Sequence, residues 1–192
     1  YLQGQWHPAE DWTLDAGVRH SRVRFVSHDR YVVGSNPDDS GRATYEATLP
    51  VLGVQWTVRP DLHLYATAGR GFETPTLNEL AYRPDGLTGL NLGLKPARSD
   101  SVELGAKAQS ATLGVLDVAV FGTRTRNEIV TLSSAGGRST YRNVAATRRL
   151  GLEVAWTKLL PGDVAVQLAY TLLAARYTDA FLACTTTPCS AP

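Results

Sequence analysis

The sequence has few cysteines, no long apolar run and no excess of charge of either sign. A membrane-spanning helix needs roughly 18–20 consecutive apolar residues, so the sequence excludes helical membrane proteins. The 19 lysines and arginines nearly balance the 18 aspartates and glutamates, which leaves a net charge of +1. This balance gives no long-range field and no basic stripe that would favour nucleic acid as a partner, although an anionic ligand can still bind locally.

The sequence also offers little for metal or redox chemistry. Its two cysteines, Cys184 and Cys189, enclose a short Thr/Pro loop. A metal site would require more ligands nearby, and a redox pair is usually closer, as in C-x-x-C. We therefore predict a Cys184–Cys189 disulfide in an oxidising compartment, with no metal site and no cofactor. The histidines are distributed along the first third of the chain: His7, His20, His28 and His63.

Apolar and polar residues alternate through nearly the whole sequence, as Val164, Val166 and Leu168 do with their neighbours. Such alternation is typical of strands with one apolar face. The other face holds Gly, Ala, Thr, Gln, Glu and Lys, as a hydrated or protein-filled lumen would. A soluble sandwich shows the same alternation. The stretches 12–30, 139–159 and 163–178, however, exceed the usual 5–6 residues and are long enough to cross a tilted bilayer.

Short breaks separate these stretches, at Pro8–Asp11, Arg59–Asp61, Gln109–Thr112 and Leu160–Asp163. They predict eight strands at about 1–7, 12–30, 44–58, 62–73, 98–109, 112–126, 139–159 and 163–178. Much longer polar loops lie at the opposite ends, at 31–43, 74–97 and 127–138 and after 178. In the second loop, Thr74 or Thr76 is placed to cap a single helical turn. Short turns at one end and long loops at the other indicate an antiparallel transmembrane β-barrel.

The tryptophans support this interpretation, because all four lie within about five residues of a predicted short turn. Indole rings favour the headgroup layer, where the ring is apolar and the N–H stays hydrated. Tryptophan packs in any β core, but a core would not place all four at one end. We predict a membrane girdle at this end, and a second girdle of aromatic residues such as Phe25, Tyr45 and Phe121 near the long loops. The first girdle comprises Trp6, Trp12, Trp56 and Trp156.

A series of short motifs runs through residues 49–107 in a fixed order. A P-x-L-G strand and a tight turn precede Leu64–Ala66 and Gly71–Phe72, and a P-T-L-N-E-L loop follows. The next strand then begins with a run of the type N-x-x-L-K-P-x-x-S-x-x-x-E-L-G. In order and spacing this segment resembles the barrel domain of TonB-dependent outer-membrane receptors; Ala97 departs from it, since many relatives carry an acid there. The matching positions are Pro50, Leu52, Gly53, Pro75–Leu80, Asn91, Leu94–Pro96, Ser99 and Glu103–Gly105.

The resemblance implies a barrel of about 22 strands with a plugged lumen, in the outer membrane of a Gram-negative bacterium. Residues 1–192 would then be a partial barrel domain, with short periplasmic turns, long extracellular loops, and the plug domain and signal peptide outside it. Such receptors are not enzymes. They import scarce nutrients, most often ferric siderophores, with energy that the TonB complex transmits through the N-terminal region. The implied partners are outer-membrane lipid, the plug domain, the TonB complex and a ferric siderophore.

Candidate ligand-binding residues lie in the predicted long loops and at their margins. Guanidinium groups pair with carboxylates, and aromatic faces cover the apolar parts of an oxygen-rich chelate. The competing interpretation is that each residue only hydrates the surface or anchors the girdle. We expect Glu103, Lys107, Arg149 and Glu153, within the strands, to line the lumen or contact the plug. The loop candidates are Arg30, Tyr31, Tyr82, Arg83, Arg138, Tyr141 and Arg142.

Other functions stay open at this point. Another nutrient, such as cobalamin, haem or a metal complex, would suit the same barrel. A small eight-stranded adhesin or structural barrel would also have eight strands, and a soluble lipocalin-like carrier would place its tryptophans inside. Catalysis has little support, since no Ser/His cluster is recognisable and Gly69–Gly71 lacks the Lys-Ser/Thr of a phosphate-binding loop.

Overall fold

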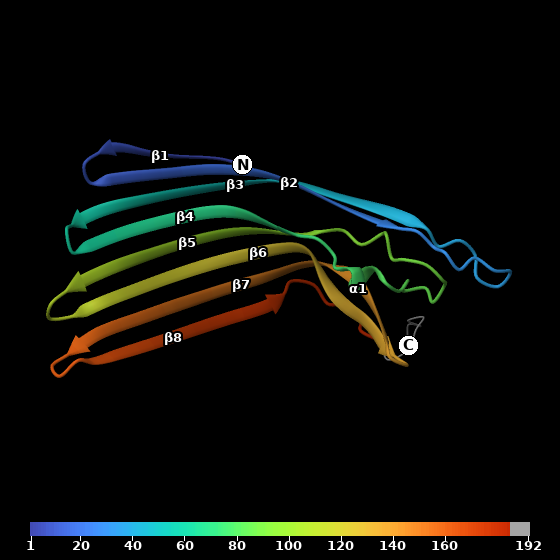
Figure 1. Ribbon diagram of the computed structural model, residues 1–192. Coiled ribbons are helices and arrows are strands. Elements are labelled where there is room, and N and C mark those ends of the chain that lie inside the picture. The colour runs from blue at the N-terminus through green and yellow to red at the C-terminus, as the bar shows by residue number, and fades with distance from the viewer. Residues whose placement is uncertain (185–192) are drawn as a thin grey trace.

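In the computed structural model, which describes residues 1–184, the chain forms one antiparallel sheet of eight strands in sequence order (Figure 1). Each strand pairs with the next along the chain, so the predicted up-and-down arrangement is confirmed. β1 and β8 are the two edges of the sheet, unlike in a small barrel closed on itself. The strands are β1 (Leu2–Ala9), β2 (Trp12–Ser27), β3 (Gly41–Arg59), β4 (Leu62–Glu73), β5 (Ala97–Ser110), β6 (Gly114–Ala135), β7 (Arg138–Leu160) and β8 (Val164–Tyr177).

The predicted short turns are also confirmed, and all four lie at one end of the sheet, on the left in Figure 1. The turn from β3 to β4 consists of Pro60 and Asp61, where proline cannot continue the hydrogen-bonded ladder. In the turn from β7 to β8, Gly162 and Asp163 have φ values of 80° and 59°. Glycine and aspartate are among the residues that tolerate this left-handed conformation best.

The predicted loop at 127–138 is wrong, because β6 and β7 continue through it as a long hairpin. They are joined by Gly136 and Gly137, whose φ values of 58° and 77° suit a two-residue type I′ turn. The ladder is irregular at Asn127, which has a φ of 55°, and between Thr131 and Ser133. The alternation that identifies a strand fades here because this part of the hairpin extends beyond the apolar face of the sheet.

The strand register separates the side chains into two faces. Leu104, Val120, Leu152 and Leu172 are aligned across β5 to β8 on one face. These residues do not form a dry core, since Leu104 and Leu172 are 54% and 58% exposed. We name this apolar face the outer face and the opposite, more polar face the inner face.

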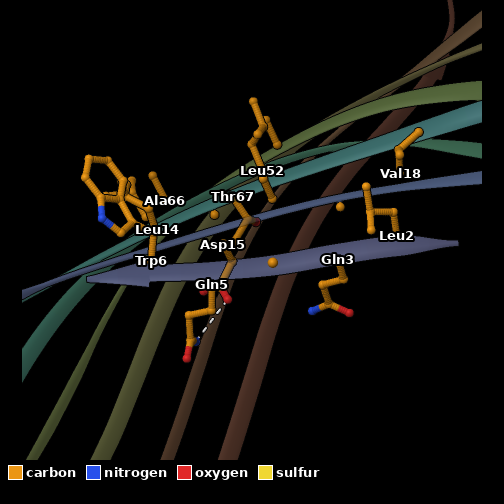
Figure 2. Close-up of a pocket in the computed structure, with 16 residues that line it drawn as sticks. Leu2, Gln3, Gln5, Trp6, Leu14, Asp15, Val18, Leu52, Ala66 and Thr67 are labelled. Atoms are coloured by element: carbon orange, nitrogen blue, oxygen red, sulfur yellow. Dashed lines mark hydrogen bonds between the residues drawn. The ribbon is translucent and has the colours of Figure 1, made fainter. Parts of the chain in front are cut away.

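The edge strand β1 shows the same division at close range (Figure 2). Leu2 and Trp6 point to the side occupied by Leu52, whereas Gln3 and Gln5 point to the other side. A shallow hollow of about 900 Å³ runs along this edge, and its walls are mainly apolar. It is therefore a stretch of the outer face beside an edge strand, without the convergent polar groups of a binding site.

Aromatic rings pack over glycines on the inner face. The ring of Tyr65 covers Gly105, and the ring of Phe121 covers Gly151, in each case on the neighbouring strand. The Tyr65 hydroxyl also donates a hydrogen bond of 2.8 Å to Glu103. These close contacts require glycine, because a Cβ atom would occupy the space of the ring.

The loop between β4 and β5 folds back over the inner face and contains the single predicted helical turn, α1 (Leu77–Leu80). Thr76 caps it in a reciprocal capping box with Glu79. Asn143 of β7 holds the far side of this loop, since it accepts a hydrogen bond from the Lys95 N–H and donates one to its carbonyl, both 2.8 Å. In residues 1–184 no helix is long and apolar enough to cross a membrane.

Candidate ligand-binding site

A groove of about 610 Å³ opens among the long loops, at the end of the sheet opposite the short turns. It brings together Arg30, Tyr31, Tyr82 and Arg138, four of the predicted ligand-binding residues. These residues come from the β2–β3 loop, the β4–β5 loop and the tip of the β6–β7 hairpin. The sheet therefore brings three segments that are far apart in the sequence to one groove, which carries arginine and tyrosine side chains beside Asp29 and Asp39.

The Arg138 guanidinium lies over the ring of Tyr82, with its Cζ 5.3 Å from the ring centroid. A cation over an aromatic face is attracted by the electron density of the ring. Neither Arg138 nor Arg30 forms an ion pair within residues 1–184. Both guanidinium groups are therefore free to pair with an anionic ligand.

The carboxylates that line the groove are partly engaged by the loop itself. Asp29 accepts hydrogen bonds from the backbone N–H of Tyr31, at 2.8 Å, and of Asp39, at 3.3 Å. Asn36 donates to the carbonyl of Tyr31. These bonds fix the β2–β3 loop and set the position of the Tyr31 side chain, which is 70% exposed.

The structure does not place Arg83 in the groove. Its Nε and Nη2 atoms donate to the two carboxylate oxygens of Asp85, at 3.1 and 2.5 Å. The hydrogen bond from Arg83 lowers the pKa of Asp85, and the same bond raises the pKa of Arg83. Asp85 also accepts from the Leu87 N–H at 3.1 Å, so the pair shapes the loop and leaves little of the guanidinium for a ligand.

Tyr141 and Arg142 also lie outside the groove, on β7. The Tyr141 carbonyl accepts a 2.9 Å hydrogen bond from Asn91, which ties the β4–β5 loop to the hairpin. The Arg142 guanidinium lies 5.6 Å from the centroid of the Phe181 ring. Tyr141 thus contributes a backbone hydrogen bond to the loop, and Arg142 makes a cation–π contact.

A second pocket, of about 470 Å³, lies on the inner face beneath the loops and was not predicted. Its walls include Glu73, Glu79, Glu128 and Arg149. Glu128 accepts from the Arg149 Nη2 at 2.6 Å and from the Thr147 hydroxyl. Burial raises the pKa of Glu128, but the hydrogen bonds from Arg149 and Thr147 outweigh it, so the net pKa lies below the ordinary value.

The inner face carries the strand charges that were expected to line the lumen. Arg149 is one of them, and Glu103, Lys107 and Glu153 lie on the same face by register. Glu128 escaped prediction because it falls within the segment assigned to a loop. Residues 1–184 contain no group of three or more His, Cys, Asp or Glu side chains that could hold a metal ion.

The tryptophans all lie on the outer face near the short turns. Trp12 and Trp56 are directly opposite and stack, with centroids 5.7 Å apart and planes at 8°. The indole N–H of Trp56 donates to Asp11 at 3.0 Å, and that of Trp156 donates to the Leu113 carbonyl at 2.7 Å. Trp6 is 64% exposed. Their role as a girdle stays a prediction.

Phe25, Tyr45 and Phe121 do not form the predicted second aromatic girdle. Phe25, Tyr45 and Phe121 all point to the inner face, and Tyr45 is only 6% exposed. Phe25 and Tyr45 make an edge-to-face contact at 6.0 Å. These three rings pack on the inner face, whereas the outer face carries charge at the loop end of the sheet.

Cys184 lies beside the β6–β7 hairpin, where its backbone N–H donates to the Leu132 carbonyl at 2.6 Å. The predicted partner, Cys189, lies outside the described residues. The Cys184–Cys189 disulfide therefore stays a prediction.

Comparison with known proteins places the chain in a family. Residues 1–188 match the family described as TonB dependent receptor-like, beta-barrel. The probable TonB-dependent receptor BfrD of Bordetella pertussis is 31% identical over 103 residues, covering 52% of this chain and 14% of BfrD.

Solved structures of other proteins share the fold, including the following two. The copper transporter OprC superimposes with a TM-score of 0.68 at 20% identity, over 89% of this chain and 28% of OprC. The siderophore receptor PirA from Pseudomonas aeruginosa gives 0.63 at 19% identity, over 90% of this chain and 33% of PirA. The chain thus spans at most a third of the length of these three relatives. They are transport receptors rather than enzymes, and the family resides in the outer membrane of Gram-negative bacteria. We conclude that this chain belongs to the TonB-dependent receptor family, as a segment of its β-barrel domain.

Proposed function

We propose that this chain forms part of the wall of an outer-membrane receptor that imports a ferric siderophore by TonB-coupled, energy-dependent transport. The groove containing Arg30, Tyr31, Tyr82 and Arg138 is the observation that supports this proposal. Ferric chelates are rich in oxygen and commonly anionic. Guanidinium groups form paired hydrogen bonds with such oxygens, and tyrosine rings cover the apolar parts of the ligand.

The size of the groove agrees with this class of ligand. Its volume of about 610 Å³ lies within the range of roughly 300–1,000 Å³ for small-molecule pockets. The groove opens at the loop end of the sheet, which faces the outside of the cell in this family. A ligand arriving from outside would meet Arg30 and Tyr31 before it reached the inner-face pocket around Glu128 and Arg149.

The inner face supports a separate part of the proposal, contact with the plug domain. Tyr65, Glu103 and Arg149 give this face hydrogen-bonding groups from several strands. A surface of this kind suits contact with another folded domain better than contact with lipid. Coupling to the TonB complex would run through the N-terminal region of the receptor, and the outer face would contact membrane lipid.

Growth of a receptor-deleted strain tests the proposal. The strain is complemented with the full-length gene and supplied with a panel of ferric chelates as the iron source. We expect at least one chelate to restore growth, and the double variant Arg30→Gln/Arg138→Gln to raise the chelate concentration needed tenfold or more. Arg59→Gln, at a short turn, is the matched control and should grow like the wild type. If haem, cobalamin or a copper complex restores growth and no ferric chelate does, the transported ligand is that nutrient and not a siderophore.

A further inference from the structure

The outer face bears a band of arginines just beyond its apolar part, on the side of the long loops. All of them are exposed, and the register places them on the same face as the apolar residues. We name this band the outer arginine belt. It consists of Arg22, Arg24, Arg42, Arg70, Arg98, Arg124, Arg126, Arg148 and Arg176.

Five residues of this face form a row across neighbouring strands. Arg70 is opposite Asp100, Asp100 opposite Arg124, Arg124 opposite Arg148, and Arg148 opposite Arg176. Asp100 is already engaged, because it accepts from Arg70 at 2.9 Å and from Arg126 at 2.5 Å.

The other end of the row contains three arginines without an acid between them. Within residues 1–184, none of Arg124, Arg148 and Arg176 takes part in an ion pair. Strands lie about 4.8 Å apart, and like charges directly opposite each other destabilise a sheet. The arrangement becomes favourable when an anion lies among the three guanidinium groups.

The belt borders the apolar part of the outer face directly. The next row below it contains Val102, Gly122, Leu150 and Ala174, about 7 Å away along the strands. On β7, Arg148 and Trp156 are eight residues apart (156 − 148), which is about 26 Å along the strand. At the usual tilt this is about 20 Å in depth, close to the apolar band of roughly 25 Å in such barrels. Arg148 therefore lies at the headgroup level opposite the tryptophans.

Two hollows in the belt combine charge with apolar surface. One of about 490 Å³ is lined by Arg124, Arg148 and Arg176 together with Val102 and Leu150. Asp100 also lines it, but its carboxylate is already paired with Arg70 and Arg126. The other, of about 620 Å³, is lined by cations of β4, the β4–β5 loop, β5 and β6: Arg70, Lys95, Arg98 and Arg126. A molecule in the first hollow meets cations at one end and apolar side chains at the other.

We propose that the outer arginine belt binds the phosphate groups of a lipid in the outer leaflet, with the triplet Arg124, Arg148 and Arg176 as its main site. Guanidinium groups form paired, charge-assisted hydrogen bonds with phosphate oxygens. The acyl chains of the same lipid would cover Val102 and Leu150. The apolar row beneath the triplet favours a phosphorylated lipid over a soluble phosphate compound. The inference rests on the orientation of the two faces and is independent of the ligand transported.

Lipid binding to the purified full-length receptor tests this proposal. The delipidated receptor is incubated with micelles that contain diphosphorylated lipid A or its dephosphorylated form, and bound lipid is counted by native mass spectrometry. The triple variant Arg124→Gln/Arg148→Gln/Arg176→Gln removes the site. The matched control, Arg59→Gln/Lys107→Gln/Lys158→Gln, removes three cations near the short turns instead.

We expect the wild type and the control to bind the phosphorylated lipid and the triple variant to bind at least fivefold less. We also expect weak binding of the dephosphorylated form and no displacement by millimolar inorganic phosphate. Equal binding by the triple variant, or equal binding of the dephosphorylated lipid, would overturn the proposal. Displacement by inorganic phosphate would instead identify a site for soluble anions. If the triple variant fails to fold, Arg148→Gln alone should bind about twofold less, and unchanged binding by that variant contradicts the proposal.

Discussion

The ring of Phe121 on β6 lies directly over the backbone of Gly151 on β7, in the space that a Cβ atom would occupy. The contact is on the inner face, where Tyr65 covers Gly105 in the same manner. These two pairs hold neighbouring strands together where the inner face has few large apolar residues.

Replacing Gly151 with alanine should therefore destabilise the barrel. The new methyl group would push the Phe121 ring aside, and overpacking of this kind typically costs about 1–3 kcal/mol. Gly53→Ala is the control, since its Cβ would lie at an ordinary 3.6 Å from the Asp15 Cβ. The free energy of unfolding of the full-length receptor in urea measures both. If Gly151→Ala and Gly53→Ala unfold with equal free energies, the Phe121 ring can move aside without destabilising the protein, which contradicts this prediction.

The Glu128–Arg149 pair should make stability depend on pH. Glu128 lies beyond the apolar face, and its pKa is below the ordinary value. A carboxyl with a lowered pKa in the folded state contributes stability above its unfolded pKa, about 4.3, and loses it as the pH falls through the lower folded pKa. The difference in unfolding free energy between the wild type and Glu128→Gln should thus be about 1 kcal/mol at pH 7 and should decrease as the pH is lowered from 5 to 3. A difference that stays constant between pH 7 and pH 3 would contradict this role for the pair.

The stacked indoles of Trp12 and Trp56 should be energetically coupled. Stacked aromatic pairs contribute about 0.5–1.5 kcal/mol beyond the area they bury. A double-mutant cycle with Trp12→Leu and Trp56→Leu, measured in lipid vesicles, should return a coupling energy in this range. Trp6 and Trp156 are the control pair, because they lie on strands β1 and β7 and should show additive effects. Additivity of Trp12 and Trp56 as well would mean that the stacking is incidental.

The loop arginines should differ in their effect on ligand binding. Arg138 faces the groove, whereas Arg83 is held by Asp85. We expect Arg138→Gln to weaken binding of the transported chelate about tenfold, as loss of a charge-assisted hydrogen bond does, and Arg83→Gln to weaken it less than threefold. Titration of the chelate into the full-length receptor, followed by intrinsic fluorescence, measures both. The reverse order would place the binding surface elsewhere in the loops.

The regular part of the fold was predictable because the membrane requires it. Residues such as Leu152 and Leu168 alternate with polar neighbours where one face meets lipid, and two of the four short turns contain proline. The β6–β7 hairpin was not predicted, since no such requirement acts beyond the apolar face and the alternation ends near Asn127. The Gly136–Gly137 pair is the local signal that identifies the hairpin.

The candidate site was predictable by residue type and less so by position. Arginine and tyrosine in long loops indicated the groove, and Arg30, Tyr31, Tyr82 and Arg138 do meet there. Arg83 was misplaced because its ion pair with Asp85 depends on the local loop conformation. The outer arginine belt was missed because its members look like isolated strand charges until the register aligns them across β4 to β8.

The orientation of the two faces is best tested by spin labels placed singly at consecutive positions of β7, from Leu150 to Ala155, in the full-length receptor in lipid vesicles. Accessibility to oxygen, which concentrates in hydrocarbon, should peak at Leu150, Leu152 and Val154. Accessibility to a water-soluble nickel complex should instead be greater at the alternate positions 151, 153 and 155. The opposite alternation, with the apolar positions shielded from oxygen, would contradict the membrane-facing assignment of this sheet.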